Sequence, residues 1–473
     1  MLHRIGGANQ FRITDHSASK RCTPKGQCCA SAPGRRLAVV DGVRQRKIMK
    51  KSFHAIGTKM ALSLACAAAL ASSHDVAARP TARYAAPAIV TVQPAAGGSD
   101  QTDALQAALN ALLDGQHLVL APGRYVVSRS LTVAKPNVVI SGYGATLAAT
   151  NPGDQTIVMS GTGSTLVGVT LVGTGTTRLT TPASTKVEVT GHGVQVLGVT
   201  IQGGASAGIF VFGGSNVAIV GNTVKETLAD GIHMTYGSTS VLVEGNTVTG
   251  TGDDLIAVVS YQGDGRVSGN VLIDRNTVSN NYWGRGISVV GGQAVTISNN
   301  TVAGVQKAAG ILVAQEDSWH TYGASNVRIE NNTVTNTQMP STVNNGLQPT
   351  QQAAIELDTW SGTVSYAVVT GNRVSGSGYS GFRALGNVCR FAVTGNTFAS
   401  IDGSPVSLLS SGCPATGIVV NGNSMNGVAL PPPVGASTSG TISAPGAVTS
   451  MLPTVRSNLM QTIAAPAPTP TRN

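Results

Sequence analysis

An asparagine recurs at a fixed place in a short strand-like unit through the second half of this 473-residue chain. The unit first reads Gly221-Asn222-Thr223-Val224 and next reads Gly245-Asn246-Thr247-Val248. Successive asparagines are 24, 30, 24, 32, 40, 24 and 27 residues apart, at Asn222, Asn246, Asn276, Asn300, Asn332, Asn372, Asn396 and Asn423. A base period of 24 residues, lengthened by insertions, is typical of a solenoid in which each repeat forms one coil. Asparagines stacked at one turn can then hydrogen-bond in a ladder along the axis.

The residues between the asparagines favour strands over helices. From Leu131 to about Met425, short β-branched runs alternate with Gly, Asn and Asp, a composition that helices tolerate poorly. A β-propeller would need a longer period with four strands in each blade. The sequence therefore predicts an all-β fold, a single-stranded right-handed parallel β-helix (solenoid) over residues 97–426.

An amphipathic helix is predicted before the first coil. Gly98-Ser99-Asp100 precedes a run whose leucines recur on one face, at Leu105, Leu109, Leu112 and Leu113. This helix, followed by many short strands, resembles the N-terminal cap of the pectate-lyase superfamily. A capping helix of this kind would cover the open end of the solenoid and block edge-to-edge pairing.

The two ends of the chain differ in composition from the coils. Residues 1–60 hold 13 of the 31 Lys and Arg but only 2 of the 21 Asp and Glu, so the net charge of +10 arises there. The basic charge therefore gives no reason to expect nucleic acid as a partner. We predict an upstream artefact or basic arm over 1–48, a signal peptide over 49–78, a linker over 79–96, and a Pro/Ala/Ser/Thr-rich tail over 427–473.

The predicted signal peptide has the usual order of parts. Met49-Lys50-Lys51 and Lys59 form a positive segment, and an apolar run from Met60 to Ala71 follows. This run is too short for a permanent membrane span. We therefore expect a secreted or periplasmic protein that has no membrane span and is a monomer.

Two cysteines lie after the predicted basic arm and signal peptide, and we expect them to form a disulfide. Cys389 and Cys413 are 24 residues apart, which matches one coil and would bring equivalent strand positions together. An exported chain is folded in a compartment where such a bond persists.

Charged residues occupy one fixed place on three successive units. Asp230, Asp254 and Arg285 each precede an isoleucine by two residues, and Asp253 lies beside Asp254. Equivalent positions on neighbouring coils lie about 4.8 Å apart, so the three acids are expected to be close neighbours. Acids at that separation repel one another unless one is protonated, a metal intervenes or a cation compensates. Protonation of one acid would give the acid and base that glycoside hydrolysis requires.

The same residues resemble the polygalacturonase family of glycoside hydrolases. Ala229-Asp230-Gly231-Ile232, Gly252-Asp253-Asp254-Leu255 and Gly284-Arg285-Gly286-Ile287 are similar, in that order, to its Asn-Thr-Asp, Gly-Asp-Asp and Gly-His-Gly signatures. The resemblance implies that Asp253 is the general acid and that Asp230 and Asp254 activate water for an inverting reaction. Arg285 replaces the family's histidine. The family's Arg-x-Lys, which grips a uronate carboxylate, is absent from residues 310–314. The expected substrate is therefore a glycan other than plain pectate.

Residues near the acids and in the insertions are candidates for substrate binding. Arg285 can hold a substrate oxygen, and His233 should point outward beside the acids. The longer spacings place insertions at 261–269, 315–324 and 338–351, and these contain Tyr261, Trp319 and Tyr322. Aromatic rings stack on sugar faces, although packing against the solenoid wall would explain the same residues.

Three functions fit the pattern. The first is an exported inverting glycoside hydrolase that uses Asp230, Asp253 and Asp254, acts on a polysaccharide or oligosaccharide, and has no metal or other cofactor. The second is a polysaccharide lyase on the same fold, with Ca²⁺ held by the acids and Arg285 as the base. The third is a non-catalytic glycan-binding or adhesive β-helix whose acids are turn residues.

Overall fold

The computed structural model describes residues 89–340, 346–411 and 417–444. The chain divides into two units, Met1–Thr81 and Ala82–Asn473. The first unit lies outside the described residues, and with it the predicted basic arm and signal peptide. Everything below concerns the second unit.

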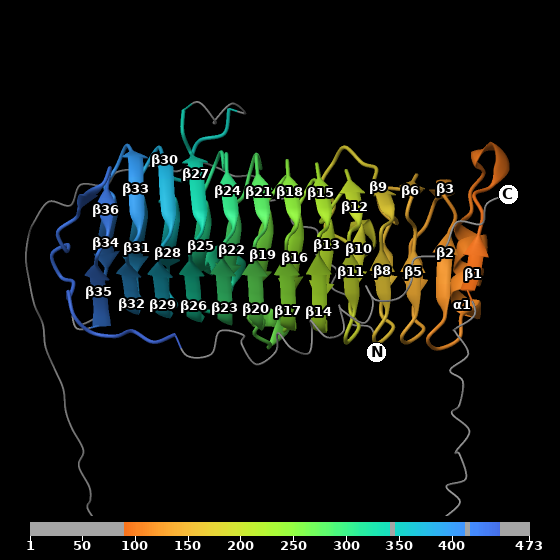
Figure 1. Cartoon of the computed structure of the whole chain (residues 1–473), viewed down its shortest axis with the longest axis horizontal. Coiled ribbons are helices and arrows are strands. Elements are labelled where there is room, and N and C mark those ends of the chain that lie inside the picture. The colour runs from red at the N-terminus through yellow and green to blue at the C-terminus, as the bar shows by residue number, and fades with distance from the viewer. Residues whose placement is uncertain (1–88, 341–345, 412–416, 445–473) are drawn as a thin grey trace, which may run out of the picture. The chain divides into compact units, whose positions relative to one another are not determined.

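The second unit is a parallel solenoid whose strands form three sheets running side by side along its axis (Figure 1). Sheet A contains β1 (Ile89–Val92), β2 (His117–Leu120), β5 (Val139–Ser141), β8 (Thr165–Val167), β11 (Gln195–Leu197), β14 (Ser215–Val220), β17 (Thr239–Glu244), β20 (Gly269–Asp274), β23 (Gly292–Ser298), β26 (Ala324–Glu330), β29 (Val364–Thr370), β32 (Val388–Thr394) and β35 (Ile418–Asn421). Sheet B contains β3 (Gly123–Val127), β6 (Ala145–Ala149), β9 (Thr170–Val172), β12 (Thr200–Gln202), β15 (Thr223–Lys225), β18 (Thr247–Thr249), β21 (Thr277–Ser279), β24 (Thr301–Ala303), β27 (Thr333–Thr337), β30 (Arg373–Ser377), β33 (Thr397–Ile401), β36 (Ser424–Met425) and β37 (Val428–Ala429). Sheet C contains β4 (Leu131–Val133), β7 (Ile157–Met159), β10 (Val187–Val189), β13 (Ile209–Phe212), β16 (Ile232–Thr235), β19 (Ile256–Val259), β22 (Ile287–Val290), β25 (Ile311–Gln315), β28 (Ile355–Thr359), β31 (Phe382–Gly386) and β34 (Val406–Ser410). The predicted parallel β-helix is confirmed.

The alternation of side chains fixes the register of the coils. Val224, Val248 and Val278 pair in line on successive strands of sheet B, and each is fully buried in the interior. A slip of one residue would turn every such side chain to the solvent face, so the apolar pattern sets one register for the whole stack. This register also decides which outward-facing residues become neighbours on sheet C.

The asparagines form the predicted ladder at the turn between sheets A and B. Asn246 accepts two hydrogen bonds at its Oδ1, from the backbone N–H and the side-chain amide of Asn222, both at 2.9 Å. Asn276 does the same for Asn246, again at 2.9 Å. Each amide also donates to a backbone carbonyl, which for Asn276 is that of Val243 at 3.0 Å. The ladder satisfies backbone groups that would otherwise be buried without a partner.

Replacement of Asn276 with alanine is expected to lower the free energy of unfolding by about 2–4 kcal/mol. The side chain is 1% exposed, and its loss strands the buried amide of Asn246 and the carbonyl of Val243. Chemical denaturation of Asn276→Ala beside the exposed neighbour Thr277→Ala measures the effect. Equal stability of the two variants would contradict it.

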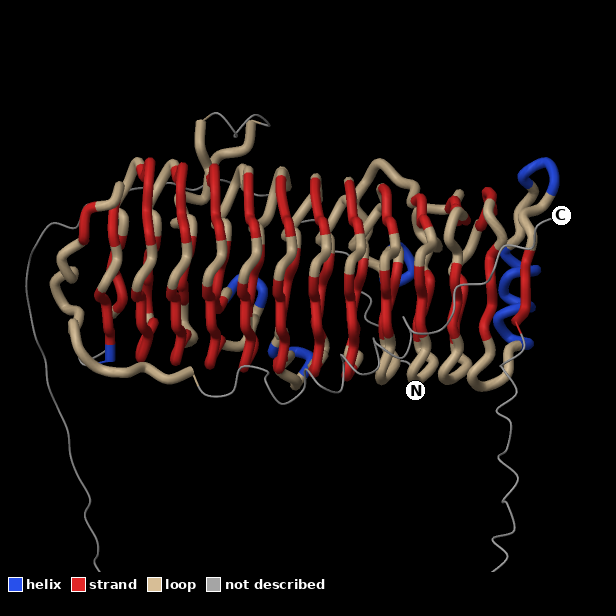
Figure 2. The backbone as a smooth tube through the Cα atoms, in the orientation of Figure 1, coloured by secondary structure: helices blue, strands red, loops and turns tan. Residues whose placement is uncertain are grey.

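A single α-helix, α1 (Thr102–Ala111), is present among the described residues, at one end of the coils (Figure 2). Its Leu105 and Leu109 are buried in the same core as the first strands, so the helix packs where the cap was predicted. Short 3₁₀ turns lying wholly within the described residues are η1 (Ala96–Gly98), η2 (Pro182–Ser184), η3 (Gln262–Asp264) and η4 (Asp317–Trp319). No helix in the described part of the chain is long and apolar enough to cross a membrane.

The boundaries predicted at both ends of the solenoid were wrong by a few residues. Ile89–Val92, assigned to the linker 79–96, forms β1 and pairs in parallel with β2, because its β-branched run fits the edge of sheet A. Val428–Ala429, assigned to the tail 427–473, forms β37 and pairs antiparallel with β36. The remainder of the predicted tail beyond residue 444 lies outside the described residues.

Cys389 in β32 is disulfide-bonded. Its predicted partner, Cys413, lies outside the described residues, so the pairing of the two stays a prediction.

Candidate active site

Three neighbouring strands of sheet C place the predicted acids. Ile232, Ile256 and Ile287 pair in register on β16, β19 and β22, so the residues two positions earlier are aligned as well. Glycines follow two of these aligned residues, at Gly231 and Gly286, and permit the close stacking. At Gly231, a Cβ would lie 2.6 Å from the carbonyl oxygen of Leu255, which no side chain could accept.

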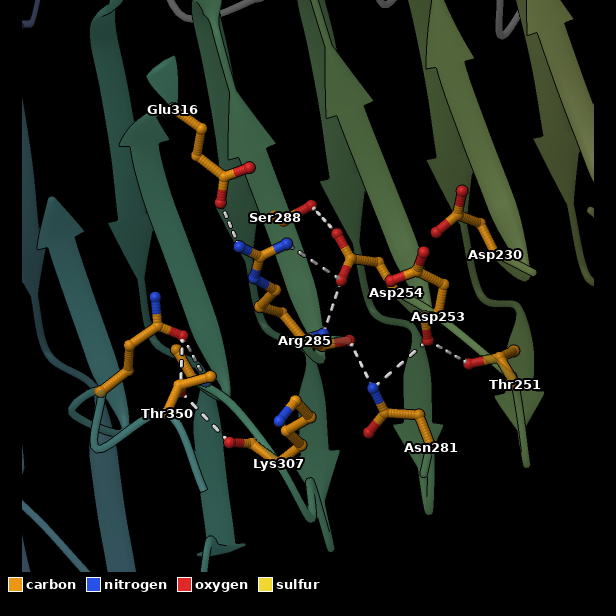
Figure 3. A network of polar contacts seen from close by, with 12 residues as sticks. Asp230, Thr251, Asp253, Asp254, Asn281, Arg285, Ser288, Lys307, Glu316 and Thr350 are labelled. Atoms are coloured by element: carbon orange, nitrogen blue, oxygen red, sulfur yellow. Dashed lines mark hydrogen bonds and ion pairs between the residues drawn. The ribbon is translucent and has the colours of Figure 1, made fainter. Parts of the chain in front are cut away.

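The structure brings Asp230, Asp253 and Asp254 together (Figure 3). One carboxylate oxygen from each lies within 4.8 Å of the others. Arg285 extends beside Asp254 from the next coil (Figure 3). The arrangement places three negative groups and one positive group on a single face of the solenoid.

Asp254 is the deepest of the three acids. It is 4% exposed, and its two oxygens accept hydrogen bonds from the Ser288 hydroxyl and the Arg285 backbone N–H, both at 2.5 Å. Burial raises the pKa of Asp254 to about 7, and the neighbouring acids add to the effect while the Arg285 guanidinium, 3.9 Å away, opposes it. This carboxyl can therefore hold a proton near neutral pH.

Asp253 faces the solvent side of the cluster. Its side chain is 20% exposed and pairs with Arg178, whose Nη1 lies 2.7 Å from Oδ2. Burial and the charge of Asp230 raise the pKa of Asp253, and Arg178 partly offsets them. The backbone carbonyl of Asp253 accepts from the Thr251 hydroxyl at 2.7 Å and from the Asn281 amide at 3.3 Å, which holds the turn in place.

Asp230 is paired with His233. Nδ1 of His233 lies 2.8 Å from Oδ2 of Asp230, and the ring stacks on Phe210 with the centroids 5.0 Å apart. His233 is 6% exposed, so it belongs to the floor of the site and was correctly expected beside the acids. The stacked ring fixes the orientation of the Asp230 carboxylate.

Arg285 links the acids to the insertion after β25. Its guanidinium contacts Glu316 as well as Asp254. Burial opposes the charge of Arg285, but Asp254 and Glu316 outweigh burial and its pKa is raised. Arg285 therefore stays protonated and its charge is shared between two carboxylates.

The acids lie in an open cleft over sheet C that reaches from the coil of β13 to the loop after β25. Tyr261 and Trp319, two of the predicted binding residues, line it. Burial and the three acids raise the pKa of Tyr261 to about 12. Tyr322 is not among the residues that line the cleft, and its backbone N–H donates to the Ser260 carbonyl.

Several residues at the cleft had no role in the sequence prediction. Phe210 and Trp283 line the cleft, and Lys307 lies over the Trp283 ring with its Nζ 4.6 Å from the centroid. Arg178 comes from the loop 173–186, which is longer than the loop 203–208 at the equivalent place. The extra length marks an insertion, but nothing in the sequence shows that it folds back over Asp253.

The oxygens of the three acids are of the type that binds Ca²⁺. Each acid, however, already has a donor from the protein: Arg178 for Asp253, His233 for Asp230, and Ser288 with the Arg285 amide for Asp254. A metal bound to Asp254 would have to compete with the Ser288 hydroxyl and the Arg285 amide for its two oxygens. The donor set therefore fits proton sharing better than metal binding.

The chain matches the model of the right-handed β-helix region over residues 150–272, 186–361 and 264–430, which together cover more than half of it. The chain belongs to the right-handed β-helix family. This match confirms the predicted handedness as well as the parallel solenoid. Among curated proteins, none matches this β-helix protein in sequence.

Solved structures share the fold at low sequence identity. The catalytic domain of a GH87 α-1,3-glucanase in complex with nigerose is 17% identical, with a TM-score of 0.54, covering 72% of this chain and 66% of that one. The GH87 α-1,3-glucanase of Streptomyces thermodiastaticus strain HF3-3 is 18% identical, with a TM-score of 0.51, covering 69% and 66%. A mannuronan C-5 epimerase A-module of Azotobacter vinelandii is 17% identical, with a TM-score of 0.46, covering 71% and 97%. This β-helix protein therefore spans about two thirds of the glucanase domains.

Proposed function

We propose that this protein hydrolyses a glycan in the cleft over sheet C. The observation that carries the proposal is the trio of acids, two of which have a raised pKa, in an open cleft with aromatic walls. A raised pKa extends to higher pH the range in which a carboxyl holds the proton that a general acid must give. A non-catalytic β-helix has no need for three carboxylates at this distance, because their repulsion costs stability.

In this proposal Asp253 is the proton donor. Its side chain is 20% exposed against 6% for Asp254, so Asp253 is the one that can contact the oxygen of a glycosidic bond. Asp253 gives its proton to that leaving oxygen, and water attacks the sugar carbon while losing a proton to Asp230 or Asp254. The resemblance to polygalacturonases implies inversion. The acids lie within 4.8 Å of one another, which is closer than the separation of roughly 6.5–9.5 Å between acid and base in most inverting enzymes. Inversion is therefore inferred from the resemblance and not from this distance.

The charges in the cleft favour a neutral glycan. Arg178 and Arg285 line it, and each is paired with an acid, Asp253 and Glu316 respectively. Neither guanidinium is left to bind a substrate carboxylate without losing its present partner. Because GH87 α-1,3-glucanases share the fold, α-1,3-glucan is the first neutral polymer to test. A secreted or periplasmic monomer, as the predicted leader implies, would meet such a polymer.

The lyase alternative requires Arg285 as a base. A base must first lose its proton, whereas Asp254 and Glu316 hold Arg285 in its charged form against the effect of burial. Both oxygens of Asp254 also accept hydrogen bonds from the protein, so Ca²⁺ would have to compete for them. Both observations favour hydrolysis over elimination.

Incubation with a panel of neutral and uronate glycans tests the proposal. We expect sugars with new reducing ends from a neutral polymer, no product that absorbs in the ultraviolet, and the same rate with and without chelator. Proton NMR of the first product anomer reads the stereochemistry. Ultraviolet-absorbing products whose formation stops with chelator would overturn hydrolysis in favour of the lyase.

A further inference from the structure

Two exposed tryptophans lie at one edge of sheet C, beyond the acids. Trp319 is 63% exposed in η4, just after β25, and Trp360 is 74% exposed directly after β28. The carboxyl ends of parallel strands meet at the same edge of a sheet, so both rings belong to one wall of the face. Trp319 lines the cleft, and Trp360 is one coil further from the acids.

Hydrogen bonds tie the loops that carry these two rings together. Oε1 of Gln315 accepts from the backbone N–H groups of Trp360 at 3.2 Å and Gly362 at 2.8 Å. Oδ1 of Asp317 accepts from the Gln315 amide at 2.8 Å and from the Ser361 hydroxyl at 2.5 Å. The exposed rings therefore stand on a braced backbone, which lowers the entropy lost when a ligand stacks on them.

Charged side chains lie on the sheet beside Trp360. Glu356 on β28 is fully buried and pairs with Arg383 on β31, whose Nε lies 2.7 Å from Oε1. Asp358, two residues along the same strand, points to the same outward face and is half-buried. The hydroxyl groups of a sugar can bond to the half-buried Asp358, and Arg383, which is paired with Glu356, carries no spare charge to attract an anion.

We propose that Trp360, with Asp358 on the adjoining sheet, forms a distal subsite that binds one pyranose unit of the glycan cleaved at the acids. The inference rests on the proposed function. β28 is three strands beyond β19 in sheet C, a separation of about 14 Å along the axis at the usual spacing. Trp360 follows β28 whereas Asp253 precedes β19, so the two residues also lie toward opposite edges of the sheet. This separation exceeds one sugar ring, so the subsite distinguishes a polymer from a disaccharide. Trp319 lies between the acids and Trp360 and continues the same binding surface.

The test measures binding in an Asp253→Asn background, where the glycan stays intact. The probes are the disaccharide and the hexasaccharide of the glycan cleaved in the panel, with α-1,3-linked glucose oligosaccharides tried first, and calorimetry gives Kd. Trp360→Ala is expected to weaken hexasaccharide binding about tenfold and to leave disaccharide binding within about twofold. Trp360→Phe should retain most of the affinity because it keeps a stacking face.

Tyr143→Ala is the matched control, since Tyr143 is 65% exposed and lies between β5 and β6, away from sheet C. Asp358→Ala should weaken hexasaccharide binding in the same direction as Trp360→Ala. Equal hexasaccharide Kd values for Trp360→Ala and the control would overturn the subsite while leaving hydrolysis intact. If the unmodified protein cleaves no glycan in the panel and its Asp253→Asn variant binds none, both the function and the subsite are overturned.

Discussion

Replacement of Asp253 with asparagine is expected to lower the turnover of glycan by a factor of about 10²–10⁴ and to leave the fold intact. The loss arises because an amide cannot give a proton to the leaving oxygen. The fold should persist because the turn is held by the Asp253 backbone carbonyl, through Thr251 and Asn281, rather than by the carboxylate. The lost ion pair is with Arg178, whose side chain is 43% exposed, so its contribution to stability is small.

The control for this substitution is Asp402→Asn. Asp402-Gly403 is an acid–glycine turn like Asp230-Gly231, but it is exposed and lies far along the solenoid from the cleft. Initial rates and thermal unfolding are measured on both variants. A catalytic role predicts lost activity with unchanged melting only for Asp253→Asn. If instead Asp253→Asn melts early and its remaining folded fraction is fully active, the acid is a turn residue.

Most of the fold could be predicted because its determinants are periodic. One asparagine marks one turn of each coil from Asn222 to Asn423, and the paired valines of sheet B set the register. The position of one coil therefore predicts the position of the next. The prediction was wrong where periodicity ends. Ile89–Val92 and Val428–Ala429 are too short to show a repeat, yet each finds an edge strand to pair with.

The residues of the candidate site also differ in whether they lie within the repeat: those that do could be predicted, and those in insertions could not. Asp230, Asp254 and Arg285 could be placed together because the register of sheet C aligns them. Arg178 could not be placed, because its loop has no repeat and its position depends on tertiary contacts alone. The pairing of Glu316 with Arg285 could not be predicted for the same reason, because Glu316 lies in the insertion after β25. Site residues that lie in insertions therefore cannot be predicted from the repeat.

Lys186 is a buried lysine that the proposed chemistry does not use, and its replacement should stabilise the protein. The side chain is 3% exposed in the turn before β10, and its Nζ donates to the Gln155 carbonyl at 3.1 Å. Among the described residues it forms no ion pair. Burial lowers the pKa of Lys186 to about 7 from 10.5. The folded state therefore carries a charge that water would solvate better.

Lys186→Met is expected to raise the free energy of unfolding by about 3–4 kcal/mol near pH 6. This estimate allows roughly 1 kcal/mol for the hydrogen bond lost by the Gln155 carbonyl. Below pH 7 the lysine is charged in both states, so the penalty of burying the charge is fully present. Between pH 7 and 10.5 the unfolded chain holds the proton more tightly than the folded one, so the parent gains stability as the pH rises.

The advantage of Lys186→Met should therefore shrink as the pH rises above 7 and vanish before 10.5, the ordinary pKa of lysine. Urea denaturation of parent and variant at several pH values measures it. Lys225→Met, at an exposed strand end, is the matched control and should show neither the gain nor its pH dependence. A gain that stays constant from neutral to alkaline pH would mean that better packing, rather than removal of the buried charge, stabilises the variant.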